Sequence, residues 1–424
     1  MKKRYPQTGI FDLFGLLGRL IGALIRRRNL GETFVAWLRH LTKRYQSPNL
    51  ILNLLVRKIL LVSGQDLSIH VLAGPPSSRH YVEGTLKKKA MTFLAPHALT
   101  ISHDEQWQTL RSYNEQVLGA GAPHVHRQAF LAHVRRAFAR PVVNIDEIRQ
   151  RMGQVMLAVV FGEGNAPDHL IDDIQTLFAE VSPRTAFLGS KKTGQRDAFQ
   201  RVLQDLWRTG AGADQPSLLA LAHAVEPQVE APYRREEILV QQIPHWMFTF
   251  TNSGSDLLDR SLAMITARPE SLQRVRQEIA AAGPLDQAET IDKLSYLAAC
   301  ILETGRLYPP VTQTVHRAAT QDEFNGVDIP AGTELLQLFP LTNRDTSLDA
   351  LANHFHPERW LDPDDAVHRN YPNLFLSGAR ACPGQDLILF IDKAALAILI
   401  QNQTFQPKST LLSSDPLPFS FPAK

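Results

Sequence analysis

Apolar residues recur three or four positions apart along most of this chain, the spacing that gathers them on one face of an α-helix. This spacing is found at residues 104–118, 126–140, 145–161, 236–267, 269–283 and 290–308. Strand patterns are fewer, and the clearest lie at 79–84 and 324–338, where Asn-Gly and Ala-Gly supply turns. We expect a mainly α protein with small β-sheets, larger than a simple helical bundle.

The composition favours one globular domain. With 424 residues, 44% of them hydrophobic, the chain can bury a large core. No internal repeat or long Pro/Gly-rich linker divides it, so we expect a single domain over residues 1–424. Its 45 Lys and Arg against 42 Asp and Glu leave a net charge of +3, which argues against nucleic acid as a partner. Two cysteines, Cys300 and Cys382, make no disulfide framework, which fits a reducing cytoplasm or a thiol kept for chemistry.

The N-terminus carries a short apolar run. Residues 13–25 form an apolar stretch of 13 residues broken by Arg19, whereas spanning a bilayer takes about 20. Three arginines follow at 26–28 with no small-residue cleavage site, which argues against a secretion signal. We expect residues 1–30 to form a helix that docks on the body of the protein or lies in a membrane interface. The expected location is the cytoplasm, with peripheral membrane contact as the alternative.

Cys382 lies in a loop of small residues, FLSGARACPGQDL, at 375–387. A thiolate is a soft, anionic ligand that a haem iron can bind. Gly378 and Gly384 would let the backbone turn sharply and approach a flat macrocycle. For Cys382 read alone, a buried and inert cysteine is the alternative.

The surroundings of Cys382 suit a haem ligand. Arg380 is placed to pair with a haem propionate, and Phe375 to cover the sulfur and keep water away. The apolar helix expected at 386–401 would point the positive end of its dipole at the thiolate. The pattern Phe-x-x-Gly-x-Arg-x-Cys-x-Gly resembles the haem-binding loop of the cytochrome P-450 family, with every fixed position met. The resemblance implies that Cys382 is the axial ligand of haem b.

The resemblance extends upstream in the expected order. "ETGR" at 303–306 is similar to the family's Glu-x-x-Arg, "RLYPP" follows it, "HPERW" at 356–360 supplies a second arginine, and "WQTLR" at 107–111 matches a Trp-x-x-x-Arg helix. Together these motifs cover about residues 104–400. They imply the cytochrome P-450 fold, triangular and helix-rich, with the haem between an oxygen-binding helix and the cysteine loop.

Glu303 and Arg306 lie three residues apart and therefore on one face of a helix. With Arg359 they would form a buried, charge-assisted structural network. A solvated surface pair is the alternative when the two residues are read alone.

Trp107 and Arg111 also share a helix face, and the resemblance implies that both contact haem propionates. A further basic residue of the family with this role corresponds by spacing to His316, ten residues after Arg306. Arg317 takes that place if the segment shifts by one residue.

The oxygen-binding helix departs from the family pattern. The family's Ala/Gly-Gly-x-Asp/Glu-Thr ends sixteen residues before a proline, and counting back from Pro269 leads to Ser253. The hydroxyl is then kept as Ser253, Asn252 replaces the acid, and Phe250 replaces a glycine that makes room for oxygen. A second register over 253–257 recovers Gly254 and Asp256 but puts a leucine at the hydroxyl position.

This change bears on catalysis, because O–O cleavage consumes protons that a hydroxyl and a titratable acid can relay. Asn252 cannot titrate, although it can orient a water. We therefore expect Ser253 and Asn252 to act in a slower or rerouted proton supply. Alternatively, Asn252 lies on the helix surface without a catalytic role.

The resemblance implies a monooxygenase that inserts oxygen from O2 into a small or medium apolar substrate, with electrons from a separate ferredoxin or flavodoxin and its reductase. The change at Asn252 leaves a peroxide-driven peroxygenase, or a haem-dependent isomerase or dehydratase, as an alternative. A haem-binding sensor or carrier without turnover is the alternative from another class. The apolar pocket is expected to include Phe93, Leu94, Trp246, Phe250 and Val311.

Overall fold

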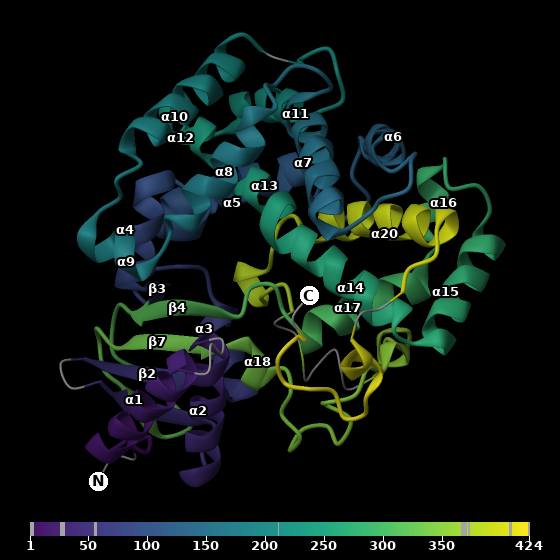
Figure 1. Ribbon diagram of the computed structural model, residues 1–424. Coiled ribbons are helices and arrows are strands. Elements are labelled where there is room, and N and C mark those ends of the chain that lie inside the picture. The colour runs from purple at the N-terminus through teal and green to yellow at the C-terminus, as the bar shows by residue number, and fades with distance from the viewer. Residues whose placement is uncertain are drawn as a thin grey trace.

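The computed structural model describes residues 4–25, 30–54, 57–210, 212–365, 371, 374–406 and 409–422 (Figure 1). The arginine run at 26–28, part of the expected N-terminal helix, lies outside the described residues. Most described residues are helical, and the strands form two small sheets. The expected fold class, mainly α with small β-sheets, is confirmed.

The α-helices are α1 (Ile10–Ile25), α2 (Leu30–Arg44), α3 (Gln65–Ala73), α4 (Thr85–Leu94), α5 (Asp104–Leu118), α6 (Arg127–Ala137), α7 (Ile145–Phe161), α8 (His169–Ala179), α9 (Pro183–Leu188), α10 (Thr193–Arg208), α11 (Leu218–Val225), α12 (Glu236–Leu239), α13 (Ile243–Phe248), α14 (Ser255–Thr266), α15 (Pro269–Ala282), α16 (Ala288–Asp292), α17 (Ser295–Leu307), α18 (Phe339–Thr342) and α20 (Gln385–Asn402). Shorter helical turns are η1 (Leu99–Ile101), η2 (Glu226–Gln228), η3 (Val240–Gln242), η4 (Thr249–Gly254), η5 (Pro357–Trp360), η6 (Gly378–Arg380) and η7 (Thr410–Ser413).

The larger sheet has the strand order β1-β2-β7-β4-β3. Its strands are β1 (Asn49–Asn53), β2 (Lys58–Val62), β3 (Tyr81–Glu83), β4 (Gln313–Ala318) and β7 (Glu334–Leu338). Only the β2–β7 pair is parallel among the pairs described. β5 (Asp322–Phe324) and β6 (Val327–Ile329) form a separate hairpin. Asn325 and Gly326 have φ of 51° and 77° at its turn, as the Asn-Gly pair predicts.

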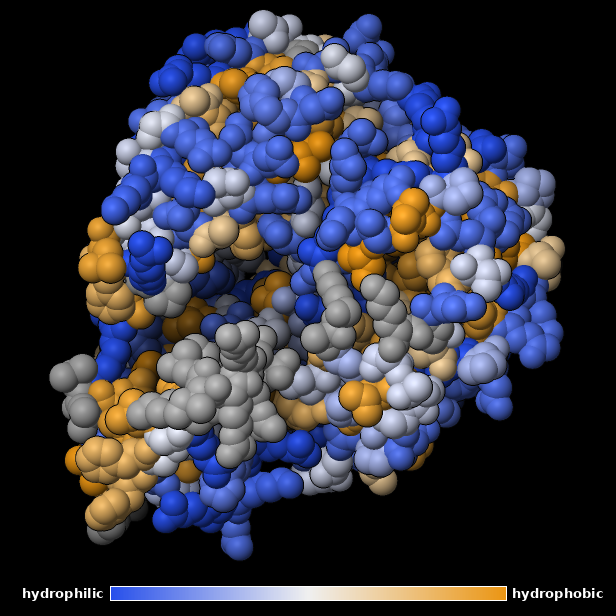
Figure 2. Space-filling view, viewed as in Figure 1, coloured by the Kyte–Doolittle hydropathy of each residue, from blue (hydrophilic) through white to orange (hydrophobic). Residues whose placement is uncertain are grey.

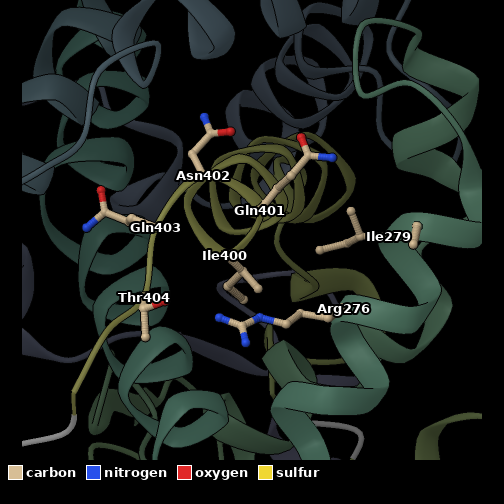
Figure 3. A pocket seen from close by; sticks show the side chains of 8 residues that line it. Arg276, Ile279, Ile400, Gln401, Asn402, Gln403 and Thr404 are labelled. Atoms are coloured by element: carbon tan, nitrogen blue, oxygen red, sulfur yellow. The ribbon is translucent and has the colours of Figure 1, made fainter.

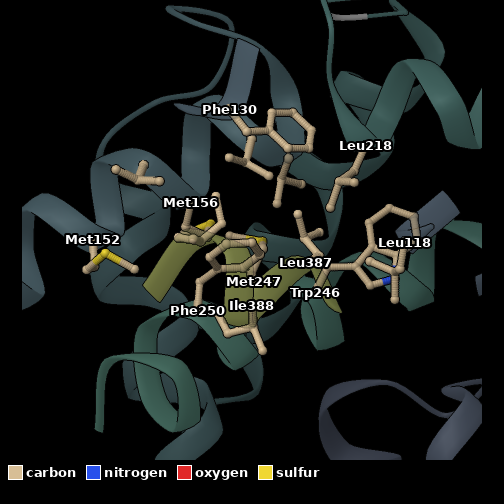
Figure 4. Close-up of a cluster of buried hydrophobic side chains, with 14 of the residues drawn as sticks. Leu118, Phe130, Met152, Met156, Leu218, Trp246, Met247, Phe250, Leu387 and Ile388 are labelled. Carbon is tan, nitrogen blue, oxygen red and sulfur yellow. The ribbon is translucent and has the colours of Figure 1, made fainter. Parts of the chain in front are cut away.

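The main core lies in the helical part of the molecule. Apolar faces of α5, α6, α7, α11, α13, α14, α17 and α20 meet in one buried cluster. Figure 4 shows a section of it, in which Trp246, Met247 and Phe250 lie near Leu387 and Ile388 of α20. Because α20 begins three residues after Cys382, this core fixes the end of the cysteine loop.

α1 docks on the sheet part of the molecule. Leu16 packs in a second cluster with Trp37 and Leu38 of α2 and with leucines of the sheet. The Asp12 carboxylate accepts hydrogen bonds from Arg44 at 2.6 Å and from the Tyr45 hydroxyl at 2.7 Å. Among the described residues, no helix combines the length and the apolar character needed to cross a bilayer.

Candidate active site

The cysteine loop is fixed at both ends. The Cys382 amide donates to the Phe375 carbonyl at 2.7 Å, and the Gln385 amide at the start of α20 donates to the Cys382 carbonyl at 3.3 Å. Gly378 has φ of +59°, and a Cβ there would lie 2.8 Å from the Leu72 carbonyl oxygen. Glycine is therefore required for the loop to pass α3, a packing reason that differs from the expected approach to a macrocycle.

The Cys382 side chain is half-buried, and neighbouring groups shift the pKa of its thiol in opposite directions. Burial, with a smaller contribution from the negative charge of Asp386, raises the pKa of the Cys382 thiol, and a hydrogen bond from the Gly384 amide and the positive charge of Arg111 offset only part of this rise. These two groups favour the thiolate, the form in which cysteine binds a metal. Gly384 directly precedes α20, and its φ of −97° is an ordinary value for any residue. Gly384 therefore contributes its amide hydrogen bond to Cys382, and not an unusual backbone conformation.

Arg380 reaches from the loop into the sheet part of the molecule. Its guanidinium donates to the carbonyls of Gly74 at 3.2 Å and Tyr81 at 2.8 Å. Its Nη1 lies 3.2 Å from Nδ1 of His316 and 3.7 Å from the Glu83 carboxylate. All three side chains of the Arg380, His316 and Glu83 cluster are buried, so these charges interact with little screening by water.

His316 is the member of this cluster with an unsatisfied atom. Burial and the charge of Arg380 hold the pKa of His316 well below its usual value, so the ring is neutral at pH 7. Its Nε2 is buried and has no hydrogen-bond partner among the described residues. Arg317, the alternative by spacing, lies on the exposed side of β4.

Arg111 approaches the cysteine loop from α5. Its guanidinium donates to the Ala381 carbonyl, and its Nε donates to Glu115 at 2.6 Å. It also lies 6.0 Å from the centre of the Trp107 ring, which is 8% exposed. The two residues thus share one face of α5, and that face meets the loop one residue before Cys382.

These residues fit a haem held by a cysteine. The unsatisfied Nε2 of His316 needs a partner, and the carboxylate of a propionate would provide one. Arg380 beside His316 and Arg111 at Ala381 supply the positive charges that such carboxylates require. Figure 2 shows this face of the molecule hollowed between the helices and the sheet, below the position that Figure 1 labels α13.

Glu303 lies at the centre of a buried charge network. Its carboxylate accepts two hydrogen bonds from Arg306, at 2.7 and 2.9 Å, and lies 3.4 Å from Nε of Arg359. The His356 amide and the Trp360 indole donate to it as well, at 3.0 and 2.9 Å. Burial alone would raise the pKa of Glu303, but Arg306 and its neighbours lower it, so the carboxylate is ionised.

One face of the helix 243–266 is half-buried, and the opposite face is buried. The half-buried residues before Asp256 are His245, Phe248, Thr249, Asn252 and Ser253, and the buried ones in the same stretch are Trp246, Met247, Phe250, Thr251, Gly254 and Ser255. Thr249, Asn252 and Ser253 of the half-buried face belong to η4, a turn of π-helix. Such turns are frequent at functional sites.

Ser253 and Asn252 lie together on the half-buried face. Ser253 Oγ donates to the Thr249 carbonyl at 3.3 Å. Nδ2 of Asn252 is buried and has no hydrogen-bond partner among the described residues. A water or ligand polar group at this face would satisfy it.

The second register for the oxygen-binding helix is not supported. Asp256, its acid, bonds to Arg149 of α7 and, at 3.0 Å, to Arg260. A Cβ at Gly254 would lie 2.6 Å from Ile388 Cδ1, so this glycine makes room for α20. Both residues of that register are therefore used in packing the helix.

The five residues expected in an apolar pocket differ in burial, and the expectation that they line one pocket stays a prediction. Trp246 and Phe250 are 1% and 3% exposed in the main core, and the Trp246 indole donates to Asn114 at 2.8 Å. Leu94 is buried in the same core, and Phe93 is half-buried beneath Arg196. Val311 is 53% exposed on the chain before β4. Phe250 packs toward Ile388 in Figure 4 and does not occupy the half-buried helix face.

A surface pocket lies elsewhere, between α15 and the end of α20 (Figure 3). Its lining includes Arg276, Ile279 and Gln401. It is separated from Cys382 by the length of α20, about 27 Å at 1.5 Å per residue. Nothing in its lining is a candidate for the chemistry of Cys382.

Sequence reasoning missed three residues of this region. Trp360 and Asp349 complete the Glu303 network, since Asp349 bonds to Arg359. His245 lies on the half-buried helix face with Nδ1 unpartnered among the described residues, and burial lowers its pKa to about 4. The spacing of four residues from His245 to Thr249, and again to Ser253, could have predicted that His245 shares a helix face with them.

Known proteins resemble this chain over part of its length. A family model described as Cytochrome P450 matches residues 236–424. Cytochrome P450 734A5 of Oryza sativa subsp. japonica is 30% identical over 183 residues, 42% of this chain and 34% of that relative. Cytochrome P450 monooxygenase 81 of Postia placenta is 29% identical over 278 residues, 59% of this chain and 49% of that relative.

A further relative, Beta-amyrin 24-hydroxylase of Glycine max, is 34% identical over 162 residues, 36% of this chain and 32% of that relative. The chain thus spans between about a third and about half of the length of these curated relatives.

Proposed function

Because this chain belongs to the cytochrome P450 family, we propose that it is a haem-thiolate monooxygenase. The proposed reaction inserts one oxygen atom of O2 into a small or medium apolar molecule. The observation that carries the proposal is the place of Cys382, half-buried just before α20 in a loop that Arg111 of α5 contacts at the Ala381 carbonyl. The names of two relatives, a monooxygenase and a hydroxylase, support it.

Haem b is the proposed cofactor, with Cys382 as its axial ligand. Arg380, Arg111 and His316 would hold the propionates, Trp107 would pack beside Arg111, and Phe375 would shield the sulfur. When bound, the haem supplies the activation of dioxygen, which a thiolate ligand promotes by donating electron density. Gly378 supports the loop through its close contact with α3.

Proton supply is the proposed role of Ser253 and Asn252. The Ser253 hydroxyl donates to the Thr249 carbonyl, and its lone pairs remain free to accept from a water. The unpartnered Nδ2 of Asn252 can donate to the same water and so orient it. Neither residue can release a proton at pH 7, so the protons must reach the site through water.

Electrons would come from a separate ferredoxin or flavodoxin with its reductase. α6 packs against α20 and carries Arg135 and Arg136 in its last turn, a basic surface for an acidic donor.

Residues 1–424 are proposed to be one domain. In α1, Phe11 and Phe14 are 82% and 59% exposed, which supports contact with a membrane surface through this helix.

A peroxygenase, isomerase or dehydratase is the second candidate. The observation that favours it is Asn252, because an acid is absent from the half-buried face of η4. Such reactions need no relay of protons from solvent to dioxygen.

Substitutions at Ser253 separate these candidates. With NADPH, a surrogate ferredoxin and its reductase, Ser253→Ala should keep haem content and substrate binding but lower product per NADPH several-fold and release peroxide, because the relay hydroxyl is lost. Ser255→Ala is the matched control, since the Ser255 hydroxyl donates to the Phe250 carbonyl on the buried face. Asn252→Asp should hold or raise the rate.

If Ser253→Ala and Asn252→Asp both match the parent, and the parent works with added hydrogen peroxide, the monooxygenase proposal gives way to the peroxygenase. Product from a substrate without either oxidant would indicate the isomerase or dehydratase.

A further inference from the structure

Two histidines and an aspartate meet on the sheet side of the molecule. His70 lies in the last turn of α3, His80 just before β3, and Asp322 at the start of β5. One ligand atom from each lies within 4.8 Å of the others. His70 Nε2 is 2.7 Å from Asp322 Oδ2. The rings of His70 and His80 lie edge to face, with their centres 5.7 Å apart.

This cluster has the composition and spacing of a metal site. Four ligands around zinc at 2.0–2.1 Å lie about 3.3 Å apart in a tetrahedron, so the three atoms need to move by about 1 Å at most. The His70 and Asp322 side chains are 30% and 23% exposed, which leaves room for that movement and for a water as fourth ligand. No described residue hydrogen-bonds to a ring nitrogen of His80, so that ring is available.

The surroundings of the cluster match those of bound metals. The Tyr81 hydroxyl donates to Asp322 Oδ2 at 2.8 Å, and the Glu323 amide donates to Oδ1 at 2.8 Å. Such outer hydrogen bonds orient a carboxylate ligand. The Tyr5 hydroxyl is buried without a hydrogen-bond partner among the described residues, and the charge of Asp322 contributes to raising its pKa. A metal-bound water would give this hydroxyl a partner.

We propose that His70, His80 and Asp322 bind a divalent zinc ion, with a water as fourth ligand and Tyr81 and Tyr5 in support. The ion joins α3 and the nearby chain before β3 to the β5–β6 hairpin, which lies far along the sequence. In the sequence, Gly74 lies between the two histidines and Tyr81 directly follows His80. The carbonyls of Gly74 and Tyr81 both accept hydrogen bonds from Arg380. The ion therefore has a structural role, holding the segment that positions Arg380.

Metal counting on the haem-loaded protein tests the proposal. After removal of any affinity tag and treatment with a chelator, the protein is dialysed against micromolar ZnCl2 with excess MgCl2, and bound zinc is measured. The parent should bind one more zinc than His80→Gln. This variant is chosen because it leaves the hydrogen bond between His70 and Asp322 in place, so a loss of zinc would not follow from a loss of that contact.

His169→Gln is the control, because His169 also lies near an aspartate, 3.8 Å from Asp173, but within the described part of the chain no second histidine joins them. Asp322→Asn should lose the zinc as His80→Gln does, and Tyr81→Phe should weaken its binding about tenfold. Zinc should also slow hydrogen exchange over residues 74–81 in the parent and not in His80→Gln. Equal zinc binding by the parent and His80→Gln would overturn the proposal, and so would exchange that zinc leaves unchanged in both. A simple hydrogen-bonded cluster would then remain.

Discussion

Glu303 is completely buried, and so is its main partner Arg306. A buried charge is stable only when nearby charges and hydrogen bonds replace the water that it has lost. Glu303 accepts four hydrogen bonds from three residues and forms an ion pair with Arg359. Arg306 also donates to the carbonyls of Asn343 and Ala352. The network thus joins α17 to the chain around η5, far along the sequence.

Removing the Glu303 carboxylate should be costly. Glu303→Ala leaves Arg306 and Arg359 buried without their shared partner, and breaking one side of a buried ion pair costs about 3–5 kcal/mol. Urea denaturation and the yield of haem-loaded protein measure the effect. The control is Glu358→Ala, because Glu358 pairs with Arg274 at the surface, where loss costs at most about 1 kcal/mol. Similar losses for the two variants would contradict a special role for Glu303.

Single residues differ in how far the sequence predicts them. The meeting of Glu303 and Arg306 follows from their spacing, because three residues of helix place both on one face. Trp360 and Asp349 do not follow, because they reach Glu303 and Arg359 only through the tertiary fold. The periodicity also puts Trp246 and Phe250 on one helix face. Which face meets the core depends on the packing of α20, which periodicity does not show. The expected place of Phe250 at the oxygen site could therefore not include this contact.

At the scale of elements, helix ends are well predicted where periodicity is regular. The expected helices at 104–118 and 145–161 coincide with α5 and α7. The stretch 236–267 is instead divided into α12, η3, α13, η4 and α14, since Pro244 and the π-turn interrupt a regular α-helix. β1 and β2 were missed because their continuous apolar residues do not alternate, as is usual for buried strands.

α1 has an exposed apolar side, with Ile10 and Leu17 beside the two phenylalanines. We expect Phe11→Ser with Phe14→Ser to weaken binding to anionic vesicles at least about tenfold, since each buried Phe contributes about 1.5–3 kcal/mol. Co-sedimentation with vesicles measures this. Val143→Ser is the control, an exposed apolar residue far from α1 in sequence. If the double variant sediments with vesicles as the parent does, α1 does not bind membranes through these phenylalanines, and its role is to dock on the sheet.

At the scale of the whole molecule, the cysteine loop lies between the helical core and the sheet. Arg111 comes from the helical side, and Arg380 extends to the sheet side, so the two parts together form the candidate haem site (Figure 1). The sequence predicted the fold class and the order of motifs. It could not predict this arrangement from periodicity, because it depends on contacts between distant segments.

Acid should destabilise the protein before its carboxylates titrate. His124 is 4% exposed, and burial lowers its pKa to about 4, against about 6.5 in the unfolded chain. Between these values the unfolded state binds a proton that the native state does not, so stability is constant above about pH 6.5 and falls as the pH drops toward 4. His124 alone contributes about 3 kcal/mol to this loss, and His245, whose pKa burial also lowers to about 4, adds to it.

Urea unfolding at pH 7 and pH 4.5 measures this effect. His124→Gln should reduce the loss of stability, whereas His169→Gln, with a side chain 60% exposed, should not. A loss unchanged by His124→Gln would show that His124 is not the group responsible.

The most direct test of the account concerns Cys382 as the haem ligand. A thiolate opposite carbon monoxide gives the reduced protein a red-shifted Soret band, which imidazole ligation does not. The parent should show this band and Cys382→Ala should lose it. Cys300→Ala should keep it, because Cys300 is completely buried in α17 and burial strongly raises its pKa. A red-shifted band that survives Cys382→Ala, or disappears in Cys300→Ala, would contradict the assignment of the ligand.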